Sequence, residues 1–181
     1  VPAVHIRDNL ELKPNQYRIQ LKGVDVGAGE AYTGQWLAIN PGNAVGSLAG
    51  TRTQDPTFGL PAVWIDASLR DQAQAMGYTV VDSSTVVGTH ISNILQNHAA
   101  ELLGREEVQQ LLDHIGKESP KLVEDLVPKV VQIGTLQKVL HNLLDEGMHI
   151  RDIRTILETL AEHTPRSQDI DDLTSAVRVA L

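Results

Sequence analysis

The hydrophobic period of this chain changes within residues 78–103, which read YTVVDSSTVVGTHISNILQNHAAELL. Residues 78–81 are aromatic or β-branched, which is typical of a strand. Residues 82–84 then offer side-chain oxygens that can cap the free amides of a helix start. The apolar residues that follow fall on one stripe of a helix: Val87, Ile91, Ile94, Leu95 and Leu102. The stretch therefore predicts a strand followed at once by a long helix over 83–103, which ends at Gly104.

The residues before this stretch have the pattern of short strands. Tyr17, Ile19 and Leu21 alternate with polar residues, as in a half-buried strand. We expect a turn at residues 27–29, and further strands at 35–39, 62–65 and 78–81. A helix over 68–76, ended by Gly77, separates the last two strands. Strand, helix and strand with short connections predict an α/β layer over about the first 82 residues.

The residues after Gly104 repeat their apolar side chains at helical spacing. Helical segments are expected over 106–115, 121–126, 136–144, 152–163 and 170–181. The whole chain is thus predicted to be α+β, with a small α/β part over 1–102 followed by a compact all-helical subdomain over 103–181. Helix 83–103 is expected to pack back on the first part.

Composition limits the classes of function. Hydrophobic residues make up 41% and charged residues 21%, which is ordinary for a globular domain. With aromatic residues at 3%, the core is expected to be aliphatic. The net charge of -8 is acidic in both predicted parts, which argues against nucleic acid and against direct contact with anionic membranes. The absence of Cys excludes disulfides and thiolate chemistry, and it fits a reducing compartment.

The sequence shows neither a membrane span nor a signal peptide. The chain starts at Val1 without an initiator Met and stops at Leu181. We interpret it as a soluble piece of a longer protein, whose membrane topology this piece does not reveal.

No group of residues has the spacing of a catalytic or metal site. The seven His form no helical His-x-x-x-His pair and no His-Glu-x-x-His motif. The glycine-rich residues 23–29 lack the Gly-Lys-Ser/Thr ending of a phosphate loop, so a turn between strands explains them better. Acidic pairs such as Glu106-Glu107 stand at helix starts, where they complement the dipole. We predict no catalytic residue, no metal and no cofactor, and hence a protein that is not an enzyme.

Residues 136–163 have the outline of a helix-turn-helix. This leaves a helical DNA-binding regulator as the alternative function. The second helix, however, carries Arg151, Arg154, Glu158 and Glu162, which is a mixed face rather than a basic one. A unit that packs into a core is the better interpretation of this charge pattern.

The segment 53–61, TQDPTFGLP, is the most informative local feature. Its Pro, Gly and Asp predict a loop, yet it contains Phe58, the single Phe of the chain. Phe58 either folds back into the local core, which physics alone favours slightly, or it is an aromatic anchor for another protein. Thr89 falls opposite the apolar stripe of its helix and is expected to face outward.

Several long stretches resemble one known family. They are residues 6–9 (IRDN), 55–65 (DPTFGLPAVWI), 77–82 (GYTVVD), 98–104 (HAAELLG) and 150–158 (IRDIRTILE). Together they resemble the cytoplasmic region of the flagellar and injectisome type III export-gate proteins, the FHIPEP family, over essentially the whole chain. The Asp-Pro-Thr-Phe loop favours the flagellar branch.

The resemblance implies a docking platform at the cytoplasmic face of the bacterial inner membrane, in a parent protein that is membrane-embedded. Its implied partners are flagellar export chaperones with bound substrates, other soluble export-apparatus proteins, and further copies of the parent in a ring. The implied chaperone dock is a hydrophobic dimple between two subdomains, and its residues correspond to Pro41, Asp55, Phe58, Val81 and Thr89. The resemblance also implies that this piece contains the end of the first cytoplasmic subdomain, the whole second one and a helical third one.

Overall fold

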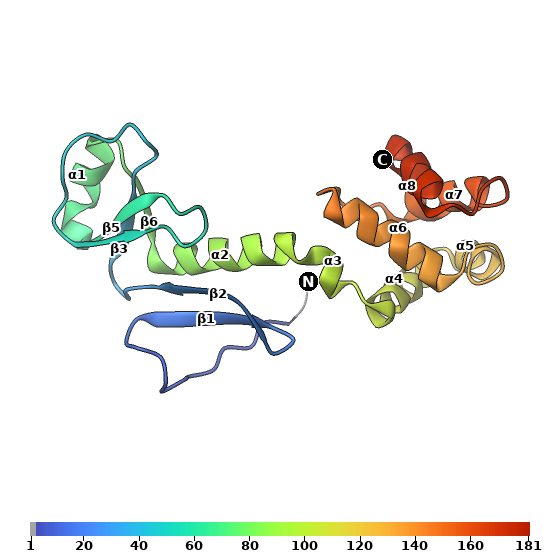
Figure 1. Cartoon of the computed structure of the whole chain (residues 1–181), viewed down its shortest axis with the longest axis horizontal. Coiled ribbons are helices and arrows are strands. Elements are labelled where there is room, and N and C mark those ends of the chain that lie inside the picture. The colour runs from blue at the N-terminus through green and yellow to red at the C-terminus, as the bar shows by residue number, and fades with distance from the viewer. Residues whose placement is uncertain (1–2) are drawn as a thin grey trace. The chain divides into compact units, whose positions relative to one another are not determined.

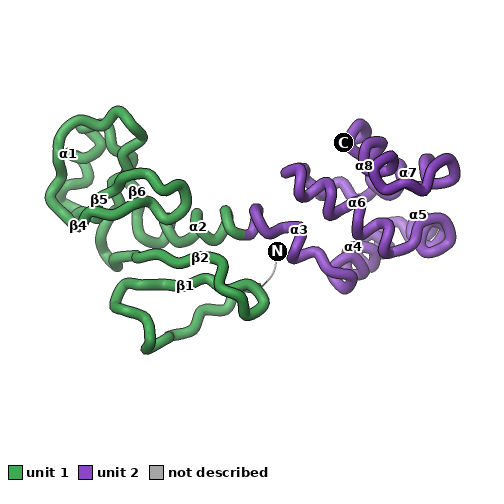
Figure 2. Tube along the Cα trace, viewed as in Figure 1, with its two compact units in different colours: residues 1–94 green, residues 95–181 purple. Residues whose placement is uncertain are grey.

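The structure is a computed structural model that describes residues 3–181 (Figure 1). The chain divides into two compact units, residues 1–94 and 95–181 (Figure 2). The first unit contains the strands and the second contains helices, so the predicted α+β class is confirmed. The division lies inside a helix, a few residues before the boundary expected at 102/103, and that subdomain boundary remains a prediction.

The first unit has two antiparallel sheets. β1 (Gln16–Leu21) and β2 (Val24–Glu30) form a hairpin. A second sheet has the order β4-β5-β3-β6 and consists of β3 (Trp36–Ile39), β4 (Thr51–Gln54), β5 (Pro61–Ile65) and β6 (Thr79–Asp82). Because β5 and β6 both pair antiparallel with β3, they run in the same direction on either side of it. The predicted strand-helix-strand unit is therefore present, with β3 inserted between its strands.

Two details of the strand prediction are wrong. β2 continues through residues 27–29, where a turn was expected; the turn lies at Lys22-Gly23, both of which have positive φ. β4 was not predicted, because its residues, Thr51–Gln54, have no apolar alternation. It is an edge strand that pairs with β5 alone, and its side chains are little buried, so its sequence has no alternation of apolar and polar residues.

Each face of the four-stranded sheet packs against a helix. On one face, Leu37, Ala62 and Trp64 pack against Val86 of α2 (Ser83–Asn97). On the other face, Ala38 and Ile65 pack with Leu48 and with Ala73 of α1 (Arg70–Ala75), which follows the short η1 (Ala67–Leu69). The sheet thus contributes alternate residues of each strand to two small cores.

The long predicted helix is interrupted. α2 ends at Asn97, and the short α3 (Ala99–Leu102) follows His98, whose backbone lies outside the helical region. Within α2 the residue Val86 packs on the sheet, while His90 and Ile94 lie against the β1–β2 hairpin. One helix therefore serves both sheets of the first unit.

The second unit is a bundle of helices with an aliphatic core, as predicted. Its helices after α3 are α4 (Arg105–Glu118), α5 (Pro120–Leu126), α6 (Ile133–Asp145), α7 (Ile153–His163) and α8 (Ile170–Ala180). Among the residues described, its buried core consists of Leu, Val and Ile side chains. Asp152 and Asp169 cap α7 and α8 by accepting hydrogen bonds from backbone amides of the first turn.

Within residues 3–181, no helix combines the length and the apolar character that crossing a bilayer requires.

Candidate functional site

The loop that joins β4 to β5 is held by its own hydrogen bonds. The backbone N–H of Asp55 donates to the Leu60 carbonyl at 2.7 Å, and the Gly59 N–H donates to the Asp55 carbonyl at 2.8 Å. The Oδ2 of Asp55 accepts from the Phe58 N–H at 2.6 Å. Gly59 has a φ of 71°, a conformation that favours glycine. Three hydrogen bonds and this glycine therefore fix the loop over residues 55–60.

Phe58 points into solvent from this loop. Its exposed fraction is 68%, whereas Asp55 in the same loop is only 6% exposed. Of the two interpretations that the sequence left open, the structure therefore excludes the one in which Phe58 plugs the local core. An exposed aromatic ring on a loop fixed by a buried carboxylate is a suitable anchor for another protein.

Thr89 is exposed on α2, as predicted, and the next residue, His90, is buried. The Nδ1 of His90 lies 2.6 Å from the hydroxyl oxygen of Tyr17 in β1, and the two rings meet edge to face with centroids 5.7 Å apart. This pair was not predicted from the sequence. The signal available was a single His in the middle of α2.

The charge of Asp55 acts on both members of this pair. Burial raises the pKa of Tyr17 to about 12, and the negative charge of Asp55 adds to the increase. Burial lowers the pKa of His90, and the charge of Asp55 opposes that decrease. Both pKa shifts favour the uncharged forms, so at neutral pH Tyr17 keeps its proton and His90 is neutral, and the tautomer of His90 decides which of the two donates the hydrogen bond. The contact between Tyr17 and His90 joins β1 to α2.

Two glycines of β2 make this meeting possible. A methyl group added at Gly27 would lie 2.5 Å from Cδ1 of Ile94 and 3.1 Å from Nε2 of His90. One added at Gly29 would lie 2.6 Å from the hydroxyl oxygen of Tyr17. The residues predicted as a turn are thus a flat stretch of strand on which two side chains rest.

Val81 lies in the four-stranded sheet, whereas Pro41 lies just after one of its strands, β3. Val81 of β6 is opposite Leu37 and packs, half-buried, against the cluster that includes Val86 of α2. Pro41 is exposed just after β3. There the Asn40 N–H donates to the carbonyl of Pro61, the first residue after the 55–60 loop, at 2.8 Å.

The five predicted residues all lie in the first unit, and contacts join only some of them. Asp55 and Phe58 share one hydrogen-bonded loop, and Thr89 is exposed on α2. Val81 reaches α2 through Val86, which is three residues before Thr89. Pro41 lies at the end of the sheet where the loop begins.

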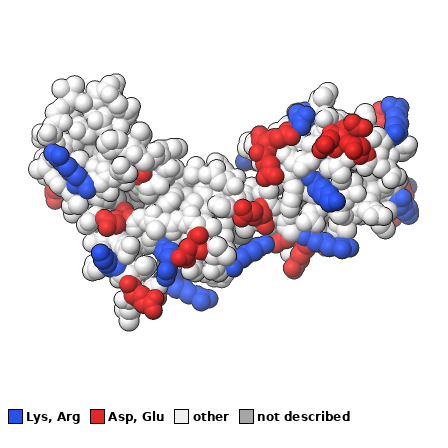
Figure 3. All heavy atoms as spheres, viewed as in Figure 1, with Lys and Arg blue, Asp and Glu red and all other residues white. Residues whose placement is uncertain are grey.

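The surface around these residues has few charges. α2 contains no Asp, Glu, Lys or Arg in its 15 residues. In Figure 3, charged side chains are sparse over the four-stranded sheet. An exposed aromatic ring in a unit whose helix α2 carries no charge favours an apolar contact over one driven by ion pairs.

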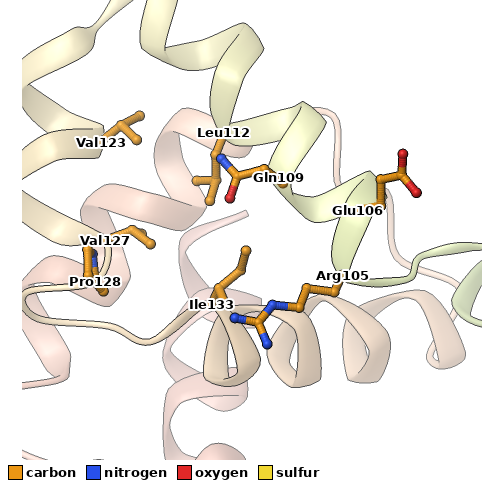
Figure 4. A pocket seen from close by; sticks show the side chains of 8 residues that line it. All are labelled: Arg105, Glu106, Gln109, Leu112, Val123, Val127, Pro128 and Ile133. Carbon is orange, nitrogen blue, oxygen red and sulfur yellow. The ribbon is translucent and has the colours of Figure 1, made fainter.

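A cavity lies elsewhere, in the second unit (Figure 4). It has a volume of about 720 Å³, and aliphatic side chains from α4, α5 and α6 line much of it, among them Leu112, Val123 and Ile133. None of the predicted site residues lines it. Within residues 3–181, no three His, Asp or Glu side chains gather in a way that could hold a metal ion.

The helices of the DNA-binding alternative show no basic face. α7 buries Ile153, Ile156, Leu157 and Leu160 in the core of the second unit. On its outer side, Arg154 pairs with Glu158 at 3.2 Å. The residues of this region pack a core and pair charges, which is what the mixed face indicated.

The chain is similar in sequence to known proteins of one family. The sequence pattern of the FHIPEP family matches residues 1–181. Over 180 residues, the chain is 62% identical to the flagellar biosynthesis protein FlhA of Escherichia coli strain K12, covering 99% of this chain and 26% of that protein. Over 181 residues it is 45% identical to the FlhA protein of Bacillus subtilis strain 168, covering 100% of this chain and 27% of that protein. The chain thus spans about a quarter of the length of these relatives.

Solved structures of other proteins share the fold. The CdsV protein of Chlamydia pneumoniae, solved in complex with CdsO, superimposes with a TM-score of 0.86 at 24% identity, covering 100% of this chain and 56% of that chain.

Proposed function

This chain belongs to the FHIPEP family, and we propose that it is a docking platform of a flagellar type III protein export gate. Its partners would be export chaperones that carry substrates, together with soluble proteins of the export apparatus. The parent protein would place it at the cytoplasmic face of the inner membrane and would assemble into a ring. The identity to flagellar relatives supports the flagellar branch, and the likeness to CdsV, whose structure holds CdsO, supports a soluble apparatus partner.

One observation carries the docking proposal: Phe58 is 68% exposed on a loop that three hydrogen bonds fix in place. Exposing an aromatic ring forgoes the stabilisation that its burial would give. A ring on a fixed loop also binds at a lower entropic cost than one on a mobile loop. Phe58 is therefore the proposed anchor, with Asp55 holding its backbone and with Val81, Thr89 and Pro41 on the surrounding surface.

The energy available from this anchor suits a transient contact. Burying a whole Phe side chain is worth about 1.5–3 kcal/mol. The exposed two thirds of Phe58 would therefore contribute on the order of 1–2 kcal/mol on docking, which is about a 5- to 30-fold change in Kd. Such an anchor favours release as well as binding, as handing over a substrate requires.

The test is the affinity of a flagellar chaperone–substrate complex for the wild-type chain, for Phe58→Ala and for Asp55→Asn, measured by titration calorimetry. We expect Phe58→Ala to weaken binding about 5- to 30-fold. Asp55→Asn keeps an oxygen that can accept the Phe58 N–H, so it should weaken binding less.

Val45→Ala is the matched control, because Val45 is an exposed apolar residue of the same unit (76%) but lies outside the proposed site. It should bind like the wild type. Equal affinities for the wild type and Phe58→Ala, with unchanged thermal unfolding, would remove the site assignment.

A further inference from the structure

The cavity of the second unit opens the aliphatic core of that unit to the surface (Figure 4). We call it the α4–α6 groove. Its volume of about 720 Å³ lies within the range of about 300–1,000 Å³ that is usual for binding sites. Leu112, which is 2% exposed, belongs to the buried core, and Val123, Val127 and Ile133 pack half-buried against that core. Because these residues come from α4, from α5 and its end, and from α6, the groove is part of the packing of the helices.

The apolar surface continues beyond the groove along the connection between α5 and α6. Pro128 lines the groove and is exposed, and Val130 is 39% exposed although it is a large apolar residue. The Val130 N–H donates to the Leu126 carbonyl at 2.9 Å, so its backbone is held in this position. Apolar side chains that gather at the surface around a hollow are typical of a contact surface.

The polar edge of the groove is formed by α4. In Figure 4 the guanidinium of Arg105 extends toward Ile133, whereas the carboxylate of Glu106 points away from the groove. The side-chain amide nitrogen of Gln109 already donates to Asp113 Oδ1 at 2.9 Å. Among the residues that the structure describes, Arg105 makes no ion pair. A cation without an anionic partner therefore stands at the edge of an aliphatic groove.

The chemistry of this edge limits what the groove can bind. The guanidinium of Arg105 has five N–H donors and no acceptor, and it pairs best with a carboxylate, through two parallel hydrogen bonds. A ligand that fills the groove needs aliphatic groups for its walls and a carboxylate for its edge. A ligand with aliphatic groups and a cation would leave Arg105 facing a like charge, which is unfavourable.

The length of the groove indicates a helix. The residues of α4 that line it extend from Arg105 to Leu112, which are seven residues or about 10 Å apart along the helix axis. Aliphatic residues at positions i, i+3 or i+4, and i+7 of a second helix extend over the same length. An amphipathic helix can thus place one apolar stripe in a groove between helices, with charged residues beside the stripe.

We propose that the α4–α6 groove binds an amphipathic helix of a partner protein, with aliphatic side chains of that helix in the groove and an Asp or Glu of that helix paired with Arg105. This surface lies in the second unit, whereas Phe58 lies in the first. The proposal goes beyond docking at Phe58 and does not depend on it.

The experiment uses two synthetic amphipathic helical peptides with the same stripe of Leu. They differ only in one residue beside the stripe, which is Glu in one peptide and Gln in the other. Each is titrated into the full chain, and the NMR signals of the Leu112, Val123, Val127 and Ile133 methyl groups are followed. Arg105→Gln removes the cation at an exposed position, and Arg166→Gln is the matched control, because Arg166 is exposed in the same unit but does not line the groove.

We expect both peptides to shift these methyl signals, and the Glu peptide to bind about 2- to 5-fold more tightly than the Gln peptide, as for one partly exposed ion pair. In Arg105→Gln the two peptides should bind equally, whereas Arg166→Gln should keep the preference. Phe58→Ala should bind both peptides like the wild type, so this result is independent of chaperone binding at Phe58.

Three outcomes would overturn the proposal. The first is the absence of shifts at the groove methyl groups with either peptide. The second is a preference for the Glu peptide that persists in Arg105→Gln while thermal unfolding of the variant is unchanged. The third is saturable binding of decanoate in the groove when neither peptide binds, because the groove would then be a site for a free aliphatic acid and not for a helix.

Discussion

Replacing Gly27 by Ala tests the packing of β2 against α2. The new methyl group would lie 2.5 Å from Cδ1 of Ile94 and 3.1 Å from Nε2 of His90. The end of the Ile94 side chain can move, but His90 is held by Tyr17. Overpacking of this kind costs about 1–3 kcal/mol. Ala is better than Gly in a strand by about 0.5–1 kcal/mol, so the net loss should be about 0.5–2 kcal/mol.

A second substitution identifies the cause. Ile94→Val removes Cδ1, the atom nearest to the new methyl group. Alone it should cost about 0.5–1.5 kcal/mol, because Ile94 is buried. The double variant should be more stable than the sum of the two single effects predicts, by on the order of 1 kcal/mol.

Urea unfolding followed by tryptophan fluorescence is the assay. Both Trp residues, Trp36 and Trp64, lie in the first unit, so the signal reports on the unit that contains Gly27. The packing argument is refuted if Gly27→Ala is as stable as the wild type. It is also refuted if the two substitutions are additive.

Two further predictions concern a titrating group and a helix cap. Because burial lowers the pKa of His90, the unfolded chain takes up this proton at a higher pH than the folded chain. The contribution of His90 to the free energy of unfolding is therefore complete above its ordinary pKa of about 6.5, and it decreases as the pH falls through that value. Urea unfolding midpoints measured from pH 8 to 5 should decrease less in His90→Asn than in the wild type. An identical decrease in the two proteins would contradict the assignment to His90. Asp169→Ala leaves the backbone amides of Asp171 and Asp172 without their acceptor, so it should lower the free energy of unfolding by about 0.5–2 kcal/mol. Thermal unfolding followed by circular dichroism measures this loss, which should be smaller for Asp169→Asn. Equal losses in the two variants would show that capping is not the cause.

The helices of the second unit could be predicted because their information is local. Apolar residues such as Leu136, Val139, Leu140 and Leu143 repeat at helical spacing, and all four are buried in α6. Caps such as Asp169 lie within three residues of the amides they bind. A helix that buries one stripe in an aliphatic core therefore has both features, the apolar spacing and the capping residue, in its own sequence.

The strands were predicted less completely for a related reason. β4 is an edge strand with little burial, so alternation is absent from its residues. Gly27 and Gly29 look like a turn in the sequence because glycine is common in turns. Glycine is needed there because Tyr17 of the paired strand lies close to Gly29, and His90 and Ile94, which are distant in the chain, lie close to Gly27.

The sequence by itself determined the change of period near residue 82, the α+β class, the aliphatic core of the helical unit and the loop that carries Phe58. Only the tertiary structure decided that Phe58 is exposed while Asp55 is buried, that Tyr17 and His90 meet, and that α2 ends at Asn97. The reason is the range of the interactions. The spacing of apolar residues and the capping of helices depend on residues that are close together in the sequence. The exposure of a loop residue depends instead on segments that only folding brings beside it.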